Sequence, residues 1–577
     1  MLKLLRITSL ALVFLLVGFG TNFFIMKNFD ETYLMVPNMT MEPIENLMAG
    51  LSEEETLVII ENNKIELDYY PRYVDDVVYV PITFVMDHFN DGFYWDNEEK
   101  ILTYTTIKDV IRMETDALTY FVNKEPISLE IPITELLEDI PFMPLELVKK
   151  FAHHDFYYDG TIDTLTIDDK SLDGKYGIVV PSTQEYGMIR SWKDKKSTVV
   201  KKAAQNEEVK IYDDDGIWLQ VRTKEGLIGY IRKEEMGEER VIAGQPVVRE
   251  IYNYDTRPTF DGALNLAWHQ VTNTTANRYL DDVLEGVHGL NVISPTWFHI
   301  KDSEGNITNI ADLDYVNKAH ARGIQVWALF SNQFDRKLTH EVLSSTKKRE
   351  KLIRELLALS ALYNLDGINV DFENVAQEDG PYFVQFMKEL TPYLKNQGLV
   401  VSVDMYVPSQ WTAHYGRKEV GEIVDYVMIM AYDEHWSTSP NSGSVASIGF
   451  VEKGITDTLK EVPKEKTVLG LPYYTRLWTE EVIDGEIKVS SRAYGMDTAY
   501  RIMTEEGVTF RWLEDIKQYY GEYEKNGKIY KMWLEEENSI EEKVKLLSKH
   551  ELVGVAGWKI GLEKEAIWDV LRKHLVP

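Results

Sequence analysis

The sequence from about residue 245 to residue 577 predicts a (β/α)8 barrel, an α/β fold, from two observations. Short apolar runs of strand length recur eight times along it. Segments with the periodicity of an amphipathic helix separate most of these runs; for example, Leu352, Leu356 and Leu359 lie on one helix face. Apolar strands that alternate with amphipathic helices are typical of a closed parallel barrel. The runs lie at 264–268, 292–296, 325–330, 367–373, 400–406, 427–432, 468–473 and 553–560.

The longest connection in this barrel lies between its seventh and eighth strands. Its length predicts a small α+β insertion over about residues 475–545. Asn526-Gly527 between strand-like segments indicates a β-hairpin turn inside the insertion. Ser539-Ile540-Glu541-Glu542 predicts a capping box that opens the last helix before the eighth strand, with Ser539 as the cap.

Length and composition limit what precedes the barrel and what the protein binds. The 577 residues leave room for further domains at roughly 150 residues per domain. The chain has 94 Asp and Glu against 62 Lys and Arg, a net charge of −32. This charge disfavours nucleic acid as a partner, because phosphate backbones require basic surfaces. The sequence contains no cysteine, which excludes disulfides, thiolate catalysis and Cys-ligated metals.

Residues 1–27 predict a signal peptide or a signal anchor. Lys3 and Arg6 precede the uncharged residues 7–26, and these 20 residues are just long enough to cross a bilayer as a helix. Gly18-Phe19-Gly20 also supplies a small-residue pattern for cleavage, so both alternatives stay open. In either case we expect an extracytoplasmic protein at a bacterial cell surface, held by one membrane helix or secreted. Residues 28–54 are polar and predict a linker.

Residues 55–170 contain two similar units that are offset by 63 residues. Pro81 and Pro144 are equivalent, as are the runs Phe-Tyr-Trp-Asp at 93–96 and Phe-Tyr-Tyr-Asp at 156–159. A shared offset at several places predicts an internal duplication. The units resemble the small α+β stalk repeats described as copper amine oxidase N-terminal-like, without a copper ligand set. We expect a spacer or a module that contacts the cell wall.

Residues 175–236 predict a small β-rich domain. Strand-like runs at 209–212, 218–221 and 229–231 are separated by Asp and Gly turns. Trp218 followed by Gly-Leu-Ile-Gly-Tyr-Ile at 226–231 resembles bacterial SH3-like wall-binding barrels. Such a domain either contacts the cell wall by binding its peptides or only separates its neighbours, and no motif here decides between these.

The fourth predicted strand carries the strongest signal for chemistry. Side chains alternate between the two faces of a strand, so Asn369, Asp371 and Glu373 share the face that lines the barrel. Three polar groups in a barrel interior are costly unless they are paired or serve a function. Glu373 lies at the C-terminal end of the strand, where barrel enzymes keep their active sites.

Three motifs in this region resemble family 18 glycoside hydrolases. Asp366-Gly-Ile-Asn-Val-Asp-Phe-Glu373 resembles the family signature Asp-x-x-Asp-x-Asp-x-Glu on the fourth strand. Met430-Ala-Tyr432-Asp433 resembles the Met-x-Tyr-Asp that ends the sixth strand, and Gly557-Trp558 resembles the tryptophan that floors the sugar subsite. The resemblance covers residues 245–577, and the three motifs occur on the fourth, sixth and eighth strands, in the order that the family has.

The resemblance implies substrate-assisted, retaining hydrolysis after an N-acetylated sugar. Glu373 would be the general acid and later the base, while the substrate's acetamido oxygen attacks the anomeric carbon. Asp371 and Tyr432 would hold the acetamido group. The expected partner is a polysaccharide that contains N-acetylglucosamine, and no metal or other cofactor is implied.

One residue departs from the family pattern. Asn369 stands where chitinases usually carry an Asp, and an amide cannot exchange a proton with its neighbour, although Asn369 can still donate a hydrogen bond to Asp371. This form of the motif resembles the branch of spore-cortex and cell-wall N-acetylglucosaminidases, which makes peptidoglycan the expected substrate. The alternatives are a chitinase, a non-catalytic glycan-binding protein on the same barrel and a structural surface protein. Family lectins typically lose the acid at the Glu373 position, and this chain keeps it.

Further residues are expected to line the substrate cleft because they lie in or beside these motifs. Trp558 is the strongest of the aromatic candidates, since flat apolar rings suit sugar faces. Asp433 either supports the substrate or caps the loop that follows it. The predicted substrate-binding set is Asp366, Asn369, Met430, Asp433, Trp436, Tyr474, Arg476 and Trp558.

Overall fold

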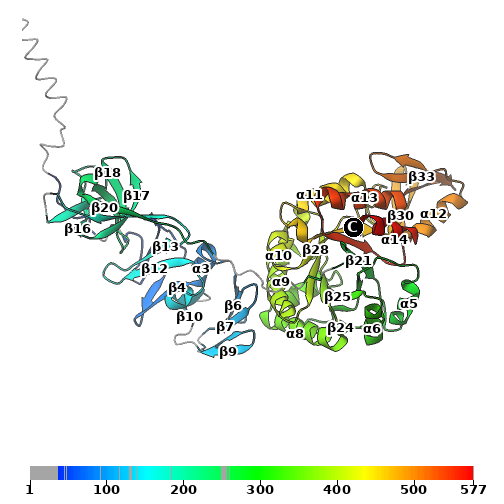
Figure 1. The fold of residues 1–577 in the computed structure, drawn as a ribbon, viewed down its shortest axis with the longest axis horizontal. Helices are drawn as coiled ribbons and strands as arrows, with labels where there is room; N and C mark the ends of the chain where they lie inside the picture. Colours follow the sequence, from blue (N-terminus) through cyan, green and yellow to red (C-terminus); the bar gives the residue numbers. More distant parts are fainter. Residues whose placement is uncertain are drawn as a thin grey trace, which may run out of the picture. The chain divides into compact units, whose positions relative to one another are not determined.

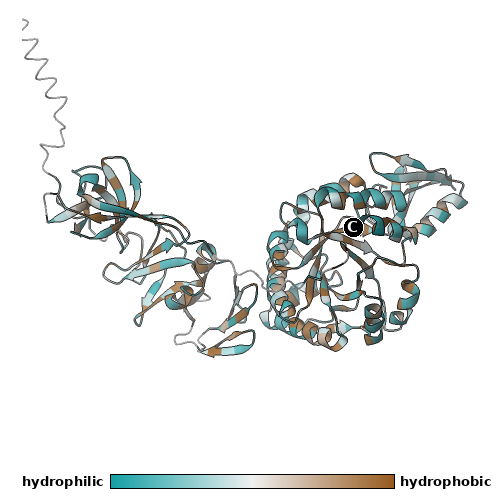
Figure 2. Ribbon diagram, viewed as in Figure 1, coloured by the Kyte–Doolittle hydropathy of each residue, from teal (hydrophilic) through white to brown (hydrophobic). Residues whose placement is uncertain are grey.

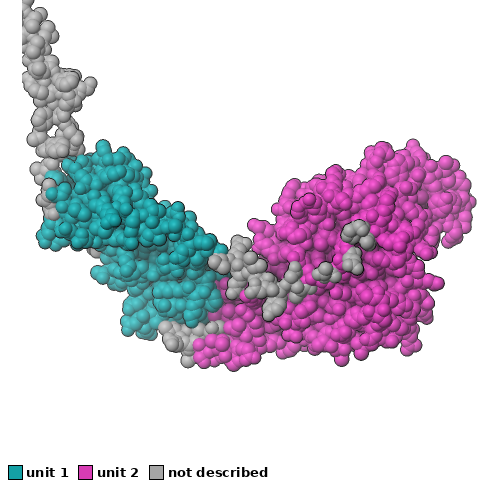
Figure 3. Space-filling model, viewed as in Figure 1, with its two compact units in different colours: residues 1–91, 131–249 teal, residues 92–130, 250–577 magenta. Residues whose placement is uncertain are grey.

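The computed structural model describes residues 37–575, apart from 44–45, 47, 53, 91, 116, 118, 129–132, 138–139, 183–184, 248–256, 259 and 261. The chain forms two compact units. One contains Met1–Asp91 and Ile131–Arg249, and the other contains Gly92–Glu130 and Glu250–Pro577 (Figure 3). The predicted signal segment lies outside the described residues. Among the residues that are described, no helix is long and apolar enough to cross a membrane.

Eight parallel strands close a barrel in the second unit, as predicted (Figure 1). The pairing of β22 with β25 completes the ring, and β23 (Phe298–Ile300) and β24 (Ile307–Asn309) extend it at that point. The barrel strands are β21 (Leu264–His269), β22 (Val292–Pro295), β25 (Gln325–Ser331), β26 (Gly367–Asp371), β27 (Val400–Tyr406), β28 (Tyr426–Met430), β29 (Thr467–Pro472) and β35 (Gly554–Trp558).

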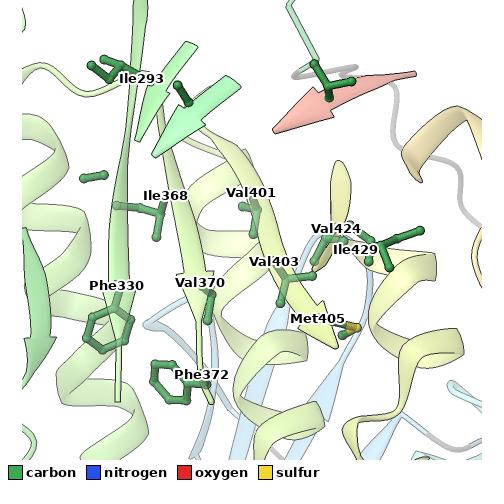
Figure 4. Close-up of a cluster of buried hydrophobic side chains, with 14 of the residues drawn as sticks. Ile293, Phe330, Ile368, Val370, Phe372, Val401, Val403, Met405, Val424 and Ile429 are labelled. Carbon is green, nitrogen blue, oxygen red and sulfur yellow. The ribbon is translucent and has the colours of Figure 1, made fainter. Parts of the chain in front are cut away.

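Helices surround the strands and cover their outer faces. Ile368 and Val370 on β26, and Phe372 directly after it, point outward and are buried against this layer (Figure 4). Brown is frequent along the barrel strands, whereas much of the surrounding helices is teal (Figure 2). The main helices are α6 (Leu313–Ala321), α7 (Arg336–Leu343), α8 (Thr346–Tyr363), α9 (Gly380–Lys395), α10 (Arg417–Ile423), α11 (Ile448–Thr458), α13 (Glu537–His550) and α14 (Ala566–Leu575).

The interior of the barrel is filled by a second apolar cluster. Trp327 stacks on Tyr426 there, with ring centroids 5.4 Å apart. Gly367 makes room for this layer, since a Cβ at that position would lie 3.0 Å from Trp327 Cδ1 and 2.7 Å from the Val400 carbonyl oxygen. The interior is therefore a packed core at this level, and polar side chains enter it only further along β26.

The predicted insertion forms a five-stranded sheet with one helix. Asn526 and Gly527 both have positive φ, 54° and 72°, and they connect β33 to β34 as a tight hairpin turn. The elements are β30 (Tyr474–Ile483), β31 (Glu486–Gly495), α12 (Met496–Glu505), β32 (Arg511–Leu513), β33 (Gln518–Lys525) and β34 (Lys528–Leu534).

The predicted capping box is present but begins three residues earlier, so the role given to Ser539 was wrong. Glu536 is the N-cap of α13, and its carboxylate accepts hydrogen bonds from the backbone N–H groups of Asn538 and Ser539. The Ser539 hydroxyl accepts the Glu536 N–H in return. The carboxylate and the hydroxyl have exchanged their usual places, and either order satisfies two free N–H groups.

The first unit contains a seven-stranded antiparallel sheet over the predicted SH3-like region. The predicted runs around 209, 218 and 229 are strands β17, β18 and β19, which are neighbours in the sheet. The strands are β14 (Gly174–Val179), β15 (Tyr186–Arg190), β16 (Val199–Ala204), β17 (Glu208–Asp214), β18 (Trp218–Arg222), β19 (Ile228–Arg232) and β20 (Met236–Ile242).

The two similar units of residues 55–170 pair with each other. Strands β4 (Val77–Pro81) and β11 (Ile140–Pro144) are antiparallel, with Val80 directly opposite Met143, its equivalent 63 residues later. Each strand leads into a short helix, α3 (Ile82–His88) or α4 (Leu145–Val148). The hairpins that follow these helices belong to different compact units. β12 (His154–Asp159) and β13 (Thr164–Asp169) join β1 (Leu57–Ile60) in the first unit, whereas the equivalent hairpin, β5 and β6, belongs to the second.

The hairpin β5–β6 belongs to a five-stranded sheet that packs on the barrel helices. Its Asp96 carboxylate accepts hydrogen bonds from the backbone N–H and the hydroxyl of Thr346 at the start of α8, at 2.9 and 2.8 Å. Arg112 of the sheet and Arg349 of α8 both pair with the buried Glu389 of α9, each at 3.0 Å. The sheet strands are β5 (Phe93–Asp96), β6 (Ile101–Thr105), β7 (Val110–Glu114), β8 (Thr119–Val122) and β9 (Glu125–Ser128).

Asp96 should therefore stabilise the barrel, although it precedes the barrel by more than 160 residues. D96A leaves the Thr346 N–H and hydroxyl buried without their acceptor, and should lower the free energy of unfolding by about 1–3 kcal/mol. Glu114→Ala on the same sheet is the matched control, since Glu114 is exposed; it should change that free energy by less than about 0.5 kcal/mol. Urea unfolding followed by tryptophan fluorescence measures both, and equal effects would contradict the assignment.

Candidate active site

Asn369 lies at the centre of a buried hydrogen-bond network inside the barrel. Its Oδ1 accepts hydrogen bonds from the Trp268 indole N–H at 2.9 Å and from the Ser294 hydroxyl at 3.2 Å. Its Nδ2 donates to the Ser402 hydroxyl at 3.1 Å and to Asp404 Oδ1 at 2.8 Å. The amide thus connects β26 to β21, β22 and β27 and satisfies its own hydrogen-bonding groups.

The expected hydrogen bond from Asn369 to Asp371 is not among these contacts. Both residues point into the barrel, but they are two positions apart on one strand, and the amide N–H groups face the neighbouring strand β27. The predicted hydrogen bond was inferred from β26 alone, whereas the acceptors of the amide N–H groups lie on β27.

Asp371 ends β26 with one oxygen unsatisfied. Its Oδ1 is buried and has no hydrogen-bond partner among the described residues. Burial raises the pKa of this carboxyl well above its usual range, and the charges of Glu373 and Asp404 raise it further. A buried oxygen without a donor costs roughly 1–3 kcal/mol. An arrangement of this kind is suited to a ligand that brings the missing N–H.

Glu373 lies two residues beyond the end of β26. Asn332 holds its backbone from both sides, accepting the Glu373 N–H at 3.0 Å and donating to the Glu373 carbonyl at 2.7 Å. Burial raises the pKa of the Glu373 carboxyl to about 6; a hydrogen bond with Tyr406 lowers it, and the charge of Asp433 raises it. A carboxyl with this pKa can both give and take a proton near neutral pH.

The sixth strand and its following loop bring a second group to the site. Burial raises the pKa of Tyr432 well above its usual range, so this phenol remains a hydrogen-bond donor. Asp433, which has a positive φ of 56°, accepts a hydrogen bond from the Tyr474 hydroxyl at 2.6 Å and lies 3.5 Å from the Arg476 guanidinium. Met430 is buried at the end of β28.

The two tryptophan candidates lie in different settings. Trp558 ends β35 and is half-buried, with its ring 6.0 Å from that of Trp268. Trp436 is 51% exposed on the loop after β28. An exposed ring is available to a sugar face, whereas the Trp558 ring is partly covered.

Asp366 is a predicted site residue that the structure does not bring to this cluster. It precedes β26, where its carboxylate binds His320 Nε2 at 2.7 Å and the Val326 N–H at 2.8 Å. Five residues of strand, about 16 Å, separate it from Asp371. Its contacts stabilise the N-terminal end of the barrel, so its place in the motif is structural.

The polar residues contributed by β27 were not predicted from the sequence. Ser402, Asp404 and Tyr406 alternate along that strand as Asn369, Asp371 and Glu373 alternate along and just beyond β26, so the same pattern indicates them. Asn332, at the end of β25, had no such signal. Among the described residues, no cluster of His, Asp and Glu is arranged to hold a metal ion.

Comparisons with known proteins agree with this geometry. Residues 250–563 match the model for glycosyl hydrolases family 18, residues 59–167 that for the copper amine oxidase N-terminal domain, and residues 188–236 that for the bacterial SH3 domain. The two N-terminal matches confirm the predicted resemblances. The copper amine oxidase match spans residues 91 and 92, where the two compact units divide.

Two curated relatives share the barrel region. The uncharacterized glycosylase YvbX of Bacillus subtilis is 25% identical over 307 residues, 49% of this chain and 84% of that protein. The cortical fragment-lytic enzyme of Bacillus anthracis is 25% identical over 249 residues, 42% of this chain and 57% of that protein. The chain therefore spans little more than half the length of the second relative.

Two solved structures share the fold. The C-terminal domain of a putative chitinase from Desulfitobacterium hafniense matches with a TM-score of 0.50 and 22% identity, covering 54% of this chain and 99% of that one. The spore cortex-lytic enzyme SleL of Bacillus cereus matches with a TM-score of 0.50 and 21% identity, covering 59% and 77%.

Proposed function

This chain belongs to glycosyl hydrolases family 18 through its residues 250–563, and from that premise we propose that it is an exported hydrolase of peptidoglycan. It would cleave the glycan after β-linked N-acetylglucosamine. The observation that carries the proposal is the pairing of a buried, unsatisfied Asp371 oxygen with Glu373, an acid whose pKa is raised to about 6. Both lie at the C-terminal end of a barrel strand, where barrel enzymes act.

In the proposed mechanism the substrate supplies its own nucleophile. The acetamido N–H would bind the free Asp371 oxygen, which would turn the acetamido oxygen toward the anomeric carbon. Glu373 would protonate the glycosidic oxygen as that bond breaks, and then take a proton from the incoming water. Tyr432 would donate a hydrogen bond to the acetamido oxygen. Asp371, once ionised, would stabilise the positive charge of the cyclic intermediate in a site with little water.

The choice of peptidoglycan depends on the neighbouring regions and the relatives. A relative of this chain is named a cortical fragment-lytic enzyme, and residues 188–236 match the bacterial SH3 domain. Export and location at the cell surface depend on the proposed role of residues 1–27, as signal peptide or anchor. Chitin carries the same acetamido group, so the same cluster would accept it if the cleft allowed.

The test exposes residues 37–577 to purified peptidoglycan and to chitin oligomers, with products identified by mass spectrometry. The whole segment is used because residues 92–130 pack on the barrel. Fragments with reducing-end N-acetylglucosamine from peptidoglycan would support the proposal. Cleavage of chitin alone would make the protein a chitinase, and binding without cleavage would leave a glycan-binding protein.

Glu373→Gln should remove the acid and lower kcat by about 10²–10⁴-fold. Glu378→Gln is the matched control, because Glu378 is exposed in the short 3-10 helix Gln377–Asp379 that follows β26. It should keep the wild-type kcat. Equal losses in the two variants, measured on the same substrate, would contradict the role of Glu373.

The pH dependence of kcat/KM should report the pKa of Glu373, which must be protonated to act. Activity should therefore fall as pH rises through about 6. Tyr406→Phe removes the hydrogen bond that lowers this pKa and should move the alkaline limb to higher pH. Asp433→Asn removes the charge that raises it and should move the limb to lower pH. If the alkaline limb moved in the same direction in both variants, Glu373 would not be the group that sets the pH profile.

A further inference from the structure

Asp404 is a buried carboxylate beside the proposed catalytic pair that no part of the mechanism uses. It is 3% exposed on β27, whose Ser402 is in register with Asn369 of β26. Continuing that register two residues along both strands places Asp404 beside Asp371 on the interior face. The site therefore contains three carboxyls, those of Asp371, Glu373 and Asp404.

Three carboxyls in a buried site cannot all be ionised at little cost. The titratable groups that face Asp404 are Asp371 at the end of β26, Glu373 just beyond that strand, and Tyr432 from the loop after β28. β21 presents the uncharged Trp268 indole to the same network. Burial raises the pKa of Asp404 well above its usual range, and the charge of Glu373 adds to this.

Hydrogen bonds decide which carboxyl of the pair ionises first. Asp404 Oδ1 accepts the Asn369 Nδ2–H at 2.8 Å, whereas Asp371 Oδ1 accepts nothing from the described residues. A hydrogen bond to the charged form favours that form. Without a ligand, the negative charge is therefore better held on Asp404 and the proton on Asp371. Asn369 cannot take part, because an amide does not titrate in this range.

We propose that Asp404 is a positioning residue that accepts the proton of Asp371 when the substrate binds. The acetamido N–H gives Asp371 the hydrogen bond that it lacks, Asp371 ionises, and its proton moves to a carboxylate oxygen of Asp404. One O–H bond breaks and one forms, with the negative charge moving from Asp404 to Asp371. The inference rests on the proposed function, because the acetamido group is what triggers the transfer.

The first test moves the carboxyl from β27 to β26. Asp404→Asn keeps the shape and an acceptor for Asn369 but cannot hold the proton, and should lower kcat on N-acetylglucosamine oligomers or peptidoglycan by roughly 10- to 100-fold. The double variant N369D/D404N restores an ionisable partner, which the Trp268 indole and Ser294 hydroxyl already face. It should recover to within about threefold of wild type, a rescue that a merely structural role would not give.

The second test needs no activity and uses the full chain. Unfolded carboxyls ionise near pH 4, whereas raised values in the folded cluster make ionisation costly, so the cluster destabilises the fold above about pH 4. D404N should therefore raise Tm at pH 7 by about 2–4 °C, and the gain should vanish as pH falls below about 4. Ser402→Ala is the matched control, since it also removes a partner of Asn369 but leaves all three carboxyls. It should show no such pH-dependent gain.

The outcomes separate this inference from the proposed function. A wild-type protein that cleaves neither glycan would overturn the function, while the Tm comparison would still test the carboxyl cluster. A cleaving wild type with D404N equally active, or with N369D/D404N no faster than D404N, would overturn the role of Asp404. A lower Tm for D404N at pH 7 would also overturn it, because Asp404 would then be a structural residue.

Discussion

The hydrogen-bond network around Asn369 is the constraint on which the site depends. Four side chains from three other strands contact this one amide, and all of them are buried. The amide therefore fixes the register of polar groups inside the barrel, directly after the apolar layer around Trp327. Because Asn369 uses its hydrogen-bonding groups on these partners, Asp371 keeps an oxygen free for something that is not protein. Satisfying one residue leaves its neighbour on the same strand unsatisfied.

The site holds mutually repelling carboxyls inside a well-packed barrel, which costs free energy. The outward residues Val370, on β26, and Phe372, directly after it, are buried in the apolar layer beneath the helices, while the inward residues bring carboxyls together. Burial and mutual repulsion hold the pKa values of Asp371 and Asp404 well above their usual range. Folded proteins tolerate such clusters where function needs them and the surrounding packing outweighs the cost. One face of this strand thus stabilises the barrel by apolar packing, and the other face carries the carboxyls of the proposed active site.

The barrel also depends on a segment far from it in the sequence. The sheet β5–β9 places Asp96 at the N-terminal end of α8 and Arg112 against Glu389, so residues 92–130 belong to the barrel unit. The hairpin β12–β13, which is the sequence equivalent of β5–β6, pairs with β1 in the other unit. Two similar sequences therefore end in different units, and the difference lies in what each one packs against.

The sequence alone determined the barrel, its eight strands, the inward row Asn369, Asp371 and Glu373, and the hairpin at Asn526 and Gly527. These follow from alternation and turn chemistry, which are local. It did not determine that Asp404 and Tyr406 join the cluster, that Asn369 bonds across to β27, or that Asp366 lies at the other end of the strand. The first two depend on strand register, which brings together residues about 35 positions apart, and the third depends on where β26 begins. Only the tertiary structure also decided that residues 92–130 pack on the barrel, because the hairpins of the two repeats have a similar local pattern and yet join different sheets.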